Sequence, residues 1–397
     1  MATYIKAVDI AVFSYPTSHY ISAWRPITKT FHLVTFLKTD SGVISLGEGT
    51  PYGSSIVEDY TKALSLAKII RGLALEDALD TLRLKEYEEF RKKSRVNYGA
   101  YLAMESAVLH ALSIHRKAKY EAEVLGGIYR TEVPVSYTIF LNHPKIMAWK
   151  LEKAIKNDFK HIKFKIPCNF EDLKKLTEYI YFVKKLNDEK DLVLRADANG
   201  CFTTYEKAMK ALALMEERGI NIVEQPMPRD RLREIARLRK SFYSSIEIMI
   251  DESLRKPSDV ELFAQLEVAD AINFHPSKLG CLSITRETIL KTQKLGLKAN
   301  IGSALMTEIG LSHYLNFAAS IPRLDYPLEE LGLCNFYGYT FLQDPLIINN
   351  GIAPLFNITI YDLDFNIMKN FLARSFLQEH VLTHIQILLN NIKKRLY

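Results

Sequence analysis

The sequence predicts an α/β fold, namely a (β/α) barrel that follows a smaller α+β domain. Three observations support this prediction. The first quarter of the chain has long segments rich in β-branched and aromatic residues, whereas the middle alternates short apolar segments with amphipathic helical ones. Polar residues recur where the short apolar segments end, and a (β/α) barrel gathers its functional side chains at the carboxyl ends of its strands. A barrel is therefore favoured over an open sheet.

Residues 1–130 are predicted to form the α+β domain, a β-meander followed by helices. Asp40, Ser41 and Gly42 form a turn signal within the meander, and the period becomes helical from about residue 57 until Gly126 and Gly127 end the run. The segments predicted to be strands are 5–13, 31–39 and 43–49.

Residues 131–322 are predicted to form the barrel. Amphipathic stretches such as 171–186 and 205–219 lie between the short apolar segments, so parallel strands joined by crossover helices are indicated. The predicted strands are 133–140, 161–166, 192–199, 221–226, 246–253, 271–275 and 297–303.

Residues 323–397 form a third segment, predicted to return to the first domain. Its stretch 357–365 is strand-like, and apolar residues at near-helical spacing then predict a long amphipathic helix to the end of the chain. Such a helix would dock on the barrel or on a partner subunit, and we therefore expect a homo-oligomer.

The composition is typical of a globular protein and excludes several classes of function. The 397 residues are 48% hydrophobic and 25% charged, and 52 Lys+Arg against 46 Asp+Glu give a formal net charge of +6. This surplus is too small to indicate a nucleic acid or a membrane as partner, but it is compatible with a small anionic substrate. No apolar run reaches the roughly 18 residues of a membrane span.

The cysteines and the N-terminus indicate a reducing compartment. The four cysteines are far apart and form no CxxC pair, so we expect no structural disulfide. The first residues carry Asp9 within an apolar stretch and lack the pattern of a signal peptide. We therefore expect a cytoplasmic protein.

Three carboxylates end consecutive predicted strands and suggest a metal site. Asp197, Glu224 and Asp251 are separated by 27 residues in each interval, about the length of one βα unit, so they should meet at one rim of the barrel. For any one of these acids alone, a helix cap or a pair with a nearby Arg is the better explanation. Three in register favour a cation, and an oxygen-only set suits Mg²⁺, with Mn²⁺ as the alternative.

Two lysines and a histidine are candidates for acid–base chemistry. Lys163 and Lys165 lie two apart on the strand before Asp197, so their side chains point the same way. A nearby cation depresses the pKa of a lysine towards the range of a general base, although the same two charges could instead hold a substrate carboxylate. His275 ends the strand after Asp251 and should lie across the barrel from them, where an imidazole can donate or accept a proton.

Together these residues resemble the enolase superfamily, and within it the muconate lactonizing enzyme branch, which includes muconate cycloisomerases, o-succinylbenzoate synthases and dipeptide epimerases. The resemblance covers roughly residues 1–355 and is carried by HIKFKI, LRADANG, VEQP and MIDES, in that order. It implies a capping domain over a modified, TIM-like (β/α)7β barrel. It also implies a bound Mg²⁺ and removal of the proton α to a substrate carboxylate to give a metal-stabilised enolate.

The resemblance also implies a role for each matching residue. Lys165 would be the base with Lys163 as its electrostatic partner, and Asp197, Glu224 and Asp251 would bind the metal. The side chains expected to support these ligands are Asn199, Glu252 and Lys278. The positions expected to select the substrate lie mainly in two cap loops and are His19, Tyr20, Trp24, Tyr52, Ser303 and Arg323.

Several positions depart from the branch. A lysine normally ends the sixth strand, but His275 stands there, with Lys278 three residues later. Arg323 replaces the first acidic residue of the dipeptide epimerases, which disfavours a dipeptide, and Ser303 stands where the mandelate racemase branch expects a histidine. We therefore expect a Mg²⁺-dependent lyase or isomerase of cycloisomerase or syn-dehydratase type. A two-base racemase using Lys165 and His275, or a metal-binding scaffold without catalysis, are the alternatives.

Overall fold

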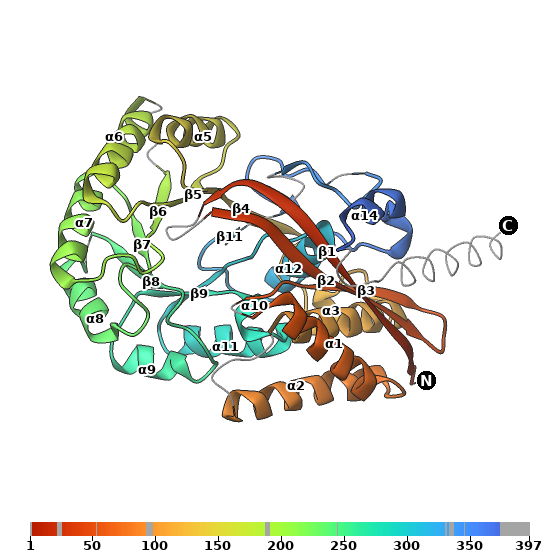
Figure 1. Ribbon diagram of the computed structural model, residues 1–397. Helices are drawn as coiled ribbons and strands as arrows, with labels where there is room; N and C mark the ends of the chain where they lie inside the picture. The colour runs from red at the N-terminus through yellow and green to blue at the C-terminus, as the bar shows by residue number, and fades with distance from the viewer. Residues whose placement is uncertain are drawn as a thin grey trace.

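The computed structural model shows a three-stranded antiparallel sheet beside a nearly closed parallel barrel (Figure 1). The predicted fold class is confirmed. The structure describes residues 2–21, 26–52, 54–92, 98–186, 191–243, 245–329, 332, 337–344 and 346–373, and within these ranges the side chains of 18–21 and 26 are not described.

The predicted meander is present and its strands are longer than expected. The strands pair antiparallel in chain order, and Gly42 adopts a φ of 89° in the turn that joins the second strand to the third. The three strands are β1 (Ile5–Ile21), β2 (Pro26–Thr39) and β3 (Ile44–Gly49).

The helices of the cap pack on this sheet. Ser55 begins the first helix with a capping box, in which its hydroxyl accepts the Glu58 N–H and the Glu58 carboxylate accepts the Ser55 N–H. Gly47 lets the third helix lie directly on the sheet, because a Cβ there would be 2.2 Å from the Ala103 oxygen. The helices are α1 (Ile56–Ile70), α2 (Leu75–Lys92), α3 (Tyr98–His115) and α4 (Ala122–Leu125).

The barrel contains all seven predicted strands and an eighth. The hydrogen-bonded order is β10-β9-β8-β7-β6-β5-β4-β11, and every pair along it is parallel. Strands β5 and β9 are four places apart in this order and so lie on opposite sides of the barrel. The strands are β4 (Glu132–Ile139), β5 (His161–Lys165), β6 (Val193–Asp197), β7 (Ile222–Glu224), β8 (Glu247–Ile250), β9 (Ala271–Phe274), β10 (Lys298–Ile301) and β11 (Leu328–Glu329).

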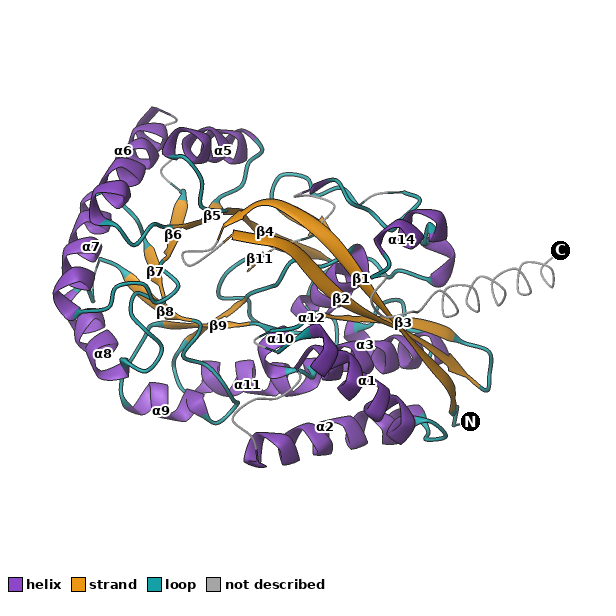
Figure 2. Cartoon of the chain, in the orientation of Figure 1, coloured by secondary structure: helices purple, strands orange, loops and turns teal. Residues whose placement is uncertain are grey.

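Crossover helices surround the strands, as Figure 2 shows. Their inward apolar faces pack against the strands in one large core, which is the usual way in which a parallel sheet is buried. The helices of this part are α5 (Pro144–Lys156), α6 (Phe170–Leu186), α7 (Tyr205–Glu217), α8 (Leu232–Ser241), α9 (Asp259–Gln265), α10 (Pro276–Leu279), α11 (Leu282–Lys294) and α12 (Glu308–Ala319).

The last described segment returns to the cap, where the Ala373 N–H donates to the Val12 oxygen over 2.8 Å. The strand predicted for 357–365 is wrong. Thr359 and Asp362 form a capping box that begins a short 3-10 turn instead. The predicted C-terminal helix falls on 374–397, outside the described residues. The elements here are β12 (Ile352–Pro354), which pairs antiparallel with β4, η1 (Ile360–Asp362) and α14 (Phe365–Phe371).

A buried carboxylate joins the cap to the barrel through hydrogen bonds. Glu48 on β3 accepts the backbone N–H groups of Thr307 and Gly310, at the start of α12, over 3.0 and 2.9 Å. The same carboxylate lies 2.8 Å from Nδ1 of His32 on β2. These contacts fix the cap above the carboxyl ends of the barrel strands. Among the described residues, every helix is too short or too polar to cross a lipid bilayer.

Candidate active site

A cavity of about 610 Å³ lies between the cap and the carboxyl ends of the barrel strands. Its lining combines cap residues, including Phe31 and Tyr52, with residues at the strand ends, including Lys165, His275 and Glu329. The predicted gathering of polar side chains at this rim is therefore what the structure shows, because the carboxyl ends of parallel strands meet at one rim.

Lys163 is the centre of a buried charge network. Its Nζ lies 2.9 Å from Asp197 Oδ2, 2.9 Å from Glu224 and 3.2 Å from Glu329, and its side chain is 4% exposed. Burial alone would lower its pKa, but the three carboxylates outweigh burial and raise it. Lys163 is therefore a permanent cation that balances the acids around it.

Lys165 lies closer to the cavity. Its Nζ donates to Asp197 Oδ2 over 2.6 Å and to Asn199 Oδ1 over 3.1 Å, and its side chain is 13% exposed. Burial would raise the pKa of Asp197, but Lys163 and Lys165 together hold it below its usual range. Asn199 also donates to Glu252 over 2.9 Å, so both predicted supporting side chains of this side are part of one network.

The acid at the end of β11 was missed by sequence reasoning. Glu329 accepts hydrogen bonds from Arg195, from Asn273 over 3.0 Å and from Asn300 over 3.1 Å. Burial would raise its pKa, but Arg195 and then Lys163 lower it to about 2. The signal was available, because Glu329 ends the eighth strand in the way that Asp197 ends β6. The strand has only two residues, which is too short for its alternation of apolar and polar residues to be recognised in the sequence.

His275 and Lys278 converge on Asp251. The Lys278 amine contacts Asp251 Oδ1 and lies 5.0 Å from the centre of the Tyr52 ring, so this lysine reaches the predicted ligand directly. Burial lowers its pKa to about 7. His275 Nε2 lies 3.1 Å from the same Asp251 oxygen, and burial lowers the pKa of the imidazole to about 4. The short helix α10 brings Lys278 to this position.

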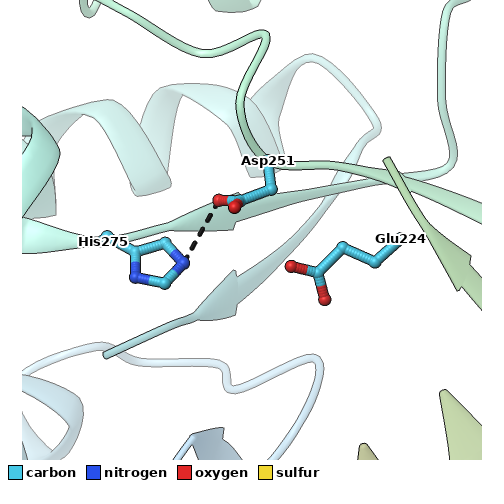
Figure 3. Close-up of side chains that lie close together, drawn as sticks. All are labelled: Glu224, Asp251 and His275. Atoms are coloured by element: carbon cyan, nitrogen blue, oxygen red, sulfur yellow. Dashed lines mark ion pairs between the residues drawn. The ribbon is translucent and has the colours of Figure 1, made fainter. Parts of the chain in front are cut away.

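Glu224, Asp251 and His275 form a buried cluster in which one ligand atom from each residue lies within 4.8 Å of the others (Figure 3). Neither nitrogen of His275 makes a hydrogen bond, although the side chain is buried and only 9% of it is exposed. A buried imidazole without hydrogen bonds beside two carboxylates fits a divalent cation. Asp197, the other predicted ligand, is bound to Lys163 and Lys165 and is not part of this cluster.

The remaining predicted site residues divide into three groups. Tyr52 and Ser303 line the cavity. Arg323 is absent from the lining; its exposed side chain forms an ion pair with the nearly buried Asp325 before β11 begins, and this position gives no support to the predicted role in substrate selection. Trp24 and the side chains of His19 and Tyr20 lie outside what the structure describes.

The family described as "Enolase C-terminal domain-like" matches residues 147–357, which is more than half of the chain and includes the strands from β5 to β11. The chain belongs to this family. The resemblance expected from the four strand-end motifs is therefore confirmed, and the barrel described above is the part on which the family is defined.

Two curated relatives and one solved structure extend this finding beyond the barrel. The L-Ala-D/L-Glu epimerase of Bacillus subtilis is 27% identical over 78% of this chain and 84% of its own. A chloromuconate cycloisomerase of Pseudomonas putida is 22% identical over 83% of this chain and 88% of its own. The muconate lactonizing enzyme from Pseudomonas fluorescens, complexed with muconolactone, superposes with a TM-score of 0.80 at 21% identity, over 94% of this chain and all of that one. The structural likeness shows a common fold for cap and barrel together.

Relatives within the enolase family thus include both cycloisomerases and epimerases. The names of the two curated relatives describe isomerases, and the solved structure has a fold that this chain reproduces. His275, the position at which the sequence predicts a departure from the branch, lies inside the buried cluster.

Proposed function

We propose that this protein is a divalent-metal-dependent lyase or isomerase that removes the proton α to the carboxylate of a small organic acid. The observation that carries the proposal is the position of Lys165, which lines the cavity and contacts a buried group of acids that a cation can join. A reaction of cycloisomerase or syn-dehydratase type needs no more than one such base.

Lys165 is the proposed base. Its amine takes the α-proton, and the electron pair of the broken C–H bond moves onto the substrate carboxylate. Lys163 stays protonated at 2.9 Å from Asp197 and keeps a positive charge beside the site. The same Lys165 then returns its proton, either to the substrate or to a group that leaves on the same face.

Glu224 and Asp251 are the proposed carboxylate ligands of the cation, because they belong both to the triad predicted from the sequence and to the cluster found in the structure. Oxygen ligands of this kind suit Mg²⁺ or Mn²⁺. When bound, the cation supplies stabilisation of the negative charge that develops on the substrate carboxylate.

The cavity supports a small substrate. Its volume of about 610 Å³ is shared between apolar cap side chains, such as Ile27 and Phe31, and the charged strand ends. An organic acid with an apolar portion towards the cap and its carboxylate towards the barrel matches this distribution.

Exchange of the α-proton in D₂O tests the proposal. A panel of small carboxylic acids is incubated with the protein and Mg²⁺ or Mn²⁺, and deuterium at the α-carbon is followed by NMR. Lys165→Ala should slow exchange by at least about 100-fold, because a positioned general base contributes that much. Lys174→Ala, on the exposed face of α6, is the matched control and should exchange like wild type.

The stereochemistry of the product separates the alternatives. Retention supports the one-base reaction with Lys165, whereas inversion would identify a two-base racemase in which His275 or another group serves the opposite face. Equal behaviour of Lys165→Ala and wild type towards every acid would refute the proposal and favour a scaffold that binds metal without turnover.

A further inference from the structure

Two thiols meet beside the cavity, although they are far apart in the sequence. Cys168 lies in the segment between β5 and α6, and Cys201 lies in the segment between β6 and α7. The Cys201 thiol donates a hydrogen bond to the Cys168 sulfur, and both residues are free cysteines. Two sulfurs in contact need only a short approach to form a disulfide, whose S–S bond is about 2.05 Å long.

The backbone places the two segments side by side. Strands β5 and β6 are parallel and paired along their whole length. The ladder continues past this pairing, because the Ile166 N–H donates to the Asp197 oxygen over 3.1 Å, and Cys168 follows on the same segment. On the other segment the Cys201 N–H donates to the Ala198 oxygen over 3.0 Å and closes a turn. The contact between the thiols is therefore a consequence of the order of the strands in the barrel.

The segment that carries Cys201 is held on both sides of this residue. The Gly200 N–H donates to the Gln225 oxygen over 2.6 Å, and the Phe202 N–H donates to the Pro226 oxygen over 3.2 Å. Both acceptors belong to the chain that follows β7, so the turn is fixed to the next strand of the barrel. When the two sulfurs approach each other, the segment between β5 and α6 is therefore the one that has to move.

The two thiols differ from each other as the members of a peroxide-sensitive pair do. Cys168 is exposed, whereas Cys201 is buried. The hydrogen bond from Cys201 lowers the pKa of the Cys168 thiol, and the same contact together with burial raises the pKa of Cys201. An accessible thiol beside a second thiol is typical of cysteines that respond to oxidants. Cys281 lacks both features, because it is buried and burial raises its pKa.

The pair lies directly beyond the residues that line the cavity on the side of Lys165. Lys165 and Asn199 belong to the described lining, and neither cysteine does. The Lys165 amine donates to Asn199 Oδ1 over 3.1 Å, so this hydrogen bond joins the same two segments as the thiol contact. A bond between the sulfurs would draw these segments together. Misplacement of a reacting group by about 1 Å can lower a rate by about 100-fold.

We propose that Cys168 and Cys201 are a reversible redox site, at which hydrogen peroxide forms a disulfide that slows the reaction at Lys165. The effect on the reaction rests on the proposed function, whereas formation of the disulfide does not.

The oxidation proceeds in two steps that balance. The Cys168 thiolate attacks one peroxide oxygen, the O–O bond breaks, and the second oxygen leaves as water with the proton of the thiol, so that a sulfenic acid remains. The Cys201 sulfur then attacks the Cys168 sulfur, the S–O bond breaks, and hydroxide leaves with the Cys201 proton as a second water. A dithiol reductant reverses the oxidation by supplying two electrons and two protons.

Thiol mapping of the full chain tests the disulfide without any substrate. The protein is reduced, freed of reductant, treated with hydrogen peroxide, alkylated under denaturing conditions and digested without reduction. Mass spectrometry should find the peptides of Cys168 and Cys201 joined to each other, and the number of free thiols should fall from four to two. Dithiothreitol should restore all four.

Three variants make the result specific. Cys168→Ser should form no disulfide, and Cys201→Ser should instead accumulate a sulfenic acid at Cys168 that dimedone traps. Cys334→Ser is the matched control and should form the disulfide like wild type.

Exchange of the α-proton then measures the effect on the reaction. Oxidised wild type should exchange at least about tenfold more slowly than reduced wild type, and dithiothreitol should restore the rate. Peroxide should leave the rate of Cys168→Ser unchanged, which separates the disulfide from oxidation elsewhere in the chain.

Wild type alone can overturn the inference, so failure of a variant to fold does not protect it. Peroxide-treated wild type that keeps four free thiols, or that joins either cysteine to a different one, would show that the contact is no redox site. A disulfide between Cys168 and Cys201 that leaves the exchange rate unchanged would overturn its control of the reaction. Absence of exchange in the reduced protein with every acid would refute the proposed function and that control, while the mapping would still decide whether the disulfide forms.

Discussion

Replacing Lys163 by methionine removes an ammonium that contacts three buried acids, and it should be among the most destabilising single changes in the barrel. Methionine keeps most of the length of the side chain but none of its charge. At 2.9 Å and an effective dielectric of about 20, each contact with Asp197 or Glu224 corresponds to about 6 kcal/mol of Coulomb energy. The cost of burying the ammonium offsets much of this attraction.

Measured losses on removing one partner of a buried ion pair are about 3–5 kcal/mol. Arg195 remains beside Glu224 and Glu329 and compensates part of the charge, so we expect a loss of about 4 kcal/mol. Urea unfolding followed by circular dichroism gives the free energy. The double variant Lys163→Met with Glu329→Gln has one buried negative charge fewer and should regain part of the loss. A single variant within about 1 kcal/mol of wild type, or a double variant less stable than the single, would refute this account of the network.

Two further predictions concern the cap. Glu48→Gln leaves one side-chain atom unable to accept the Thr307 or Gly310 N–H. Since hydrogen bonds to a charged group contribute about 1.5–3 kcal/mol each, we expect the free energy of unfolding to fall by about 2–3 kcal/mol and amide exchange at both residues to become faster. Unchanged exchange at both residues would contradict the role of Glu48 in joining the cap to the barrel. Burial of Asp59 raises the pKa of its carboxyl group from 3.8 to about 6, although hydrogen bonds from Ser54 and Ala100 oppose the shift. Wild type therefore loses stability as the pH rises from about 4 to 6. Over this range the stability of Asp59→Asn relative to wild type should increase by up to about 3 kcal/mol. A difference that does not vary with pH in urea unfolding would show that this carboxyl group is ionised throughout.

The strands of the barrel and their polar ends could be predicted because each obeys a local rule. Buried parallel strands are short apolar runs, and the acids that follow them, such as Asp197 and Asp251, occur at the spacing of one βα unit. Local chemistry also explains the error at 357–365, where alternating apolar residues suggested a strand. The side chains of Thr359 and Asp362 instead satisfy the backbone of a tight turn.

Contacts between distant residues could not be read in the same way. Glu329 is 166 residues from Lys163, and the strand that it ends has only two residues, too few to be recognised by their period. The surroundings of His275 and Asp197 depend on side-chain directions that follow from packing against Gly302 and from the placement of two lysines. Arg323 was likewise placed by its position in the sequence alone, and the structure puts it before the strand begins, in an ion pair with Asp325.

The position of Tyr52 has a consequence for how this protein could be re-engineered. Its ring belongs to the cap, yet it covers the imidazole of His275 and the amine of Lys278. Exchanging the cap loop with that of a relative would therefore alter the solvent access of two ionisable groups in the barrel as well as the shape of the pocket. The cap loop and the barrel rim are therefore structurally coupled in this chain, and loop grafts should be designed with compensating changes at the barrel rim.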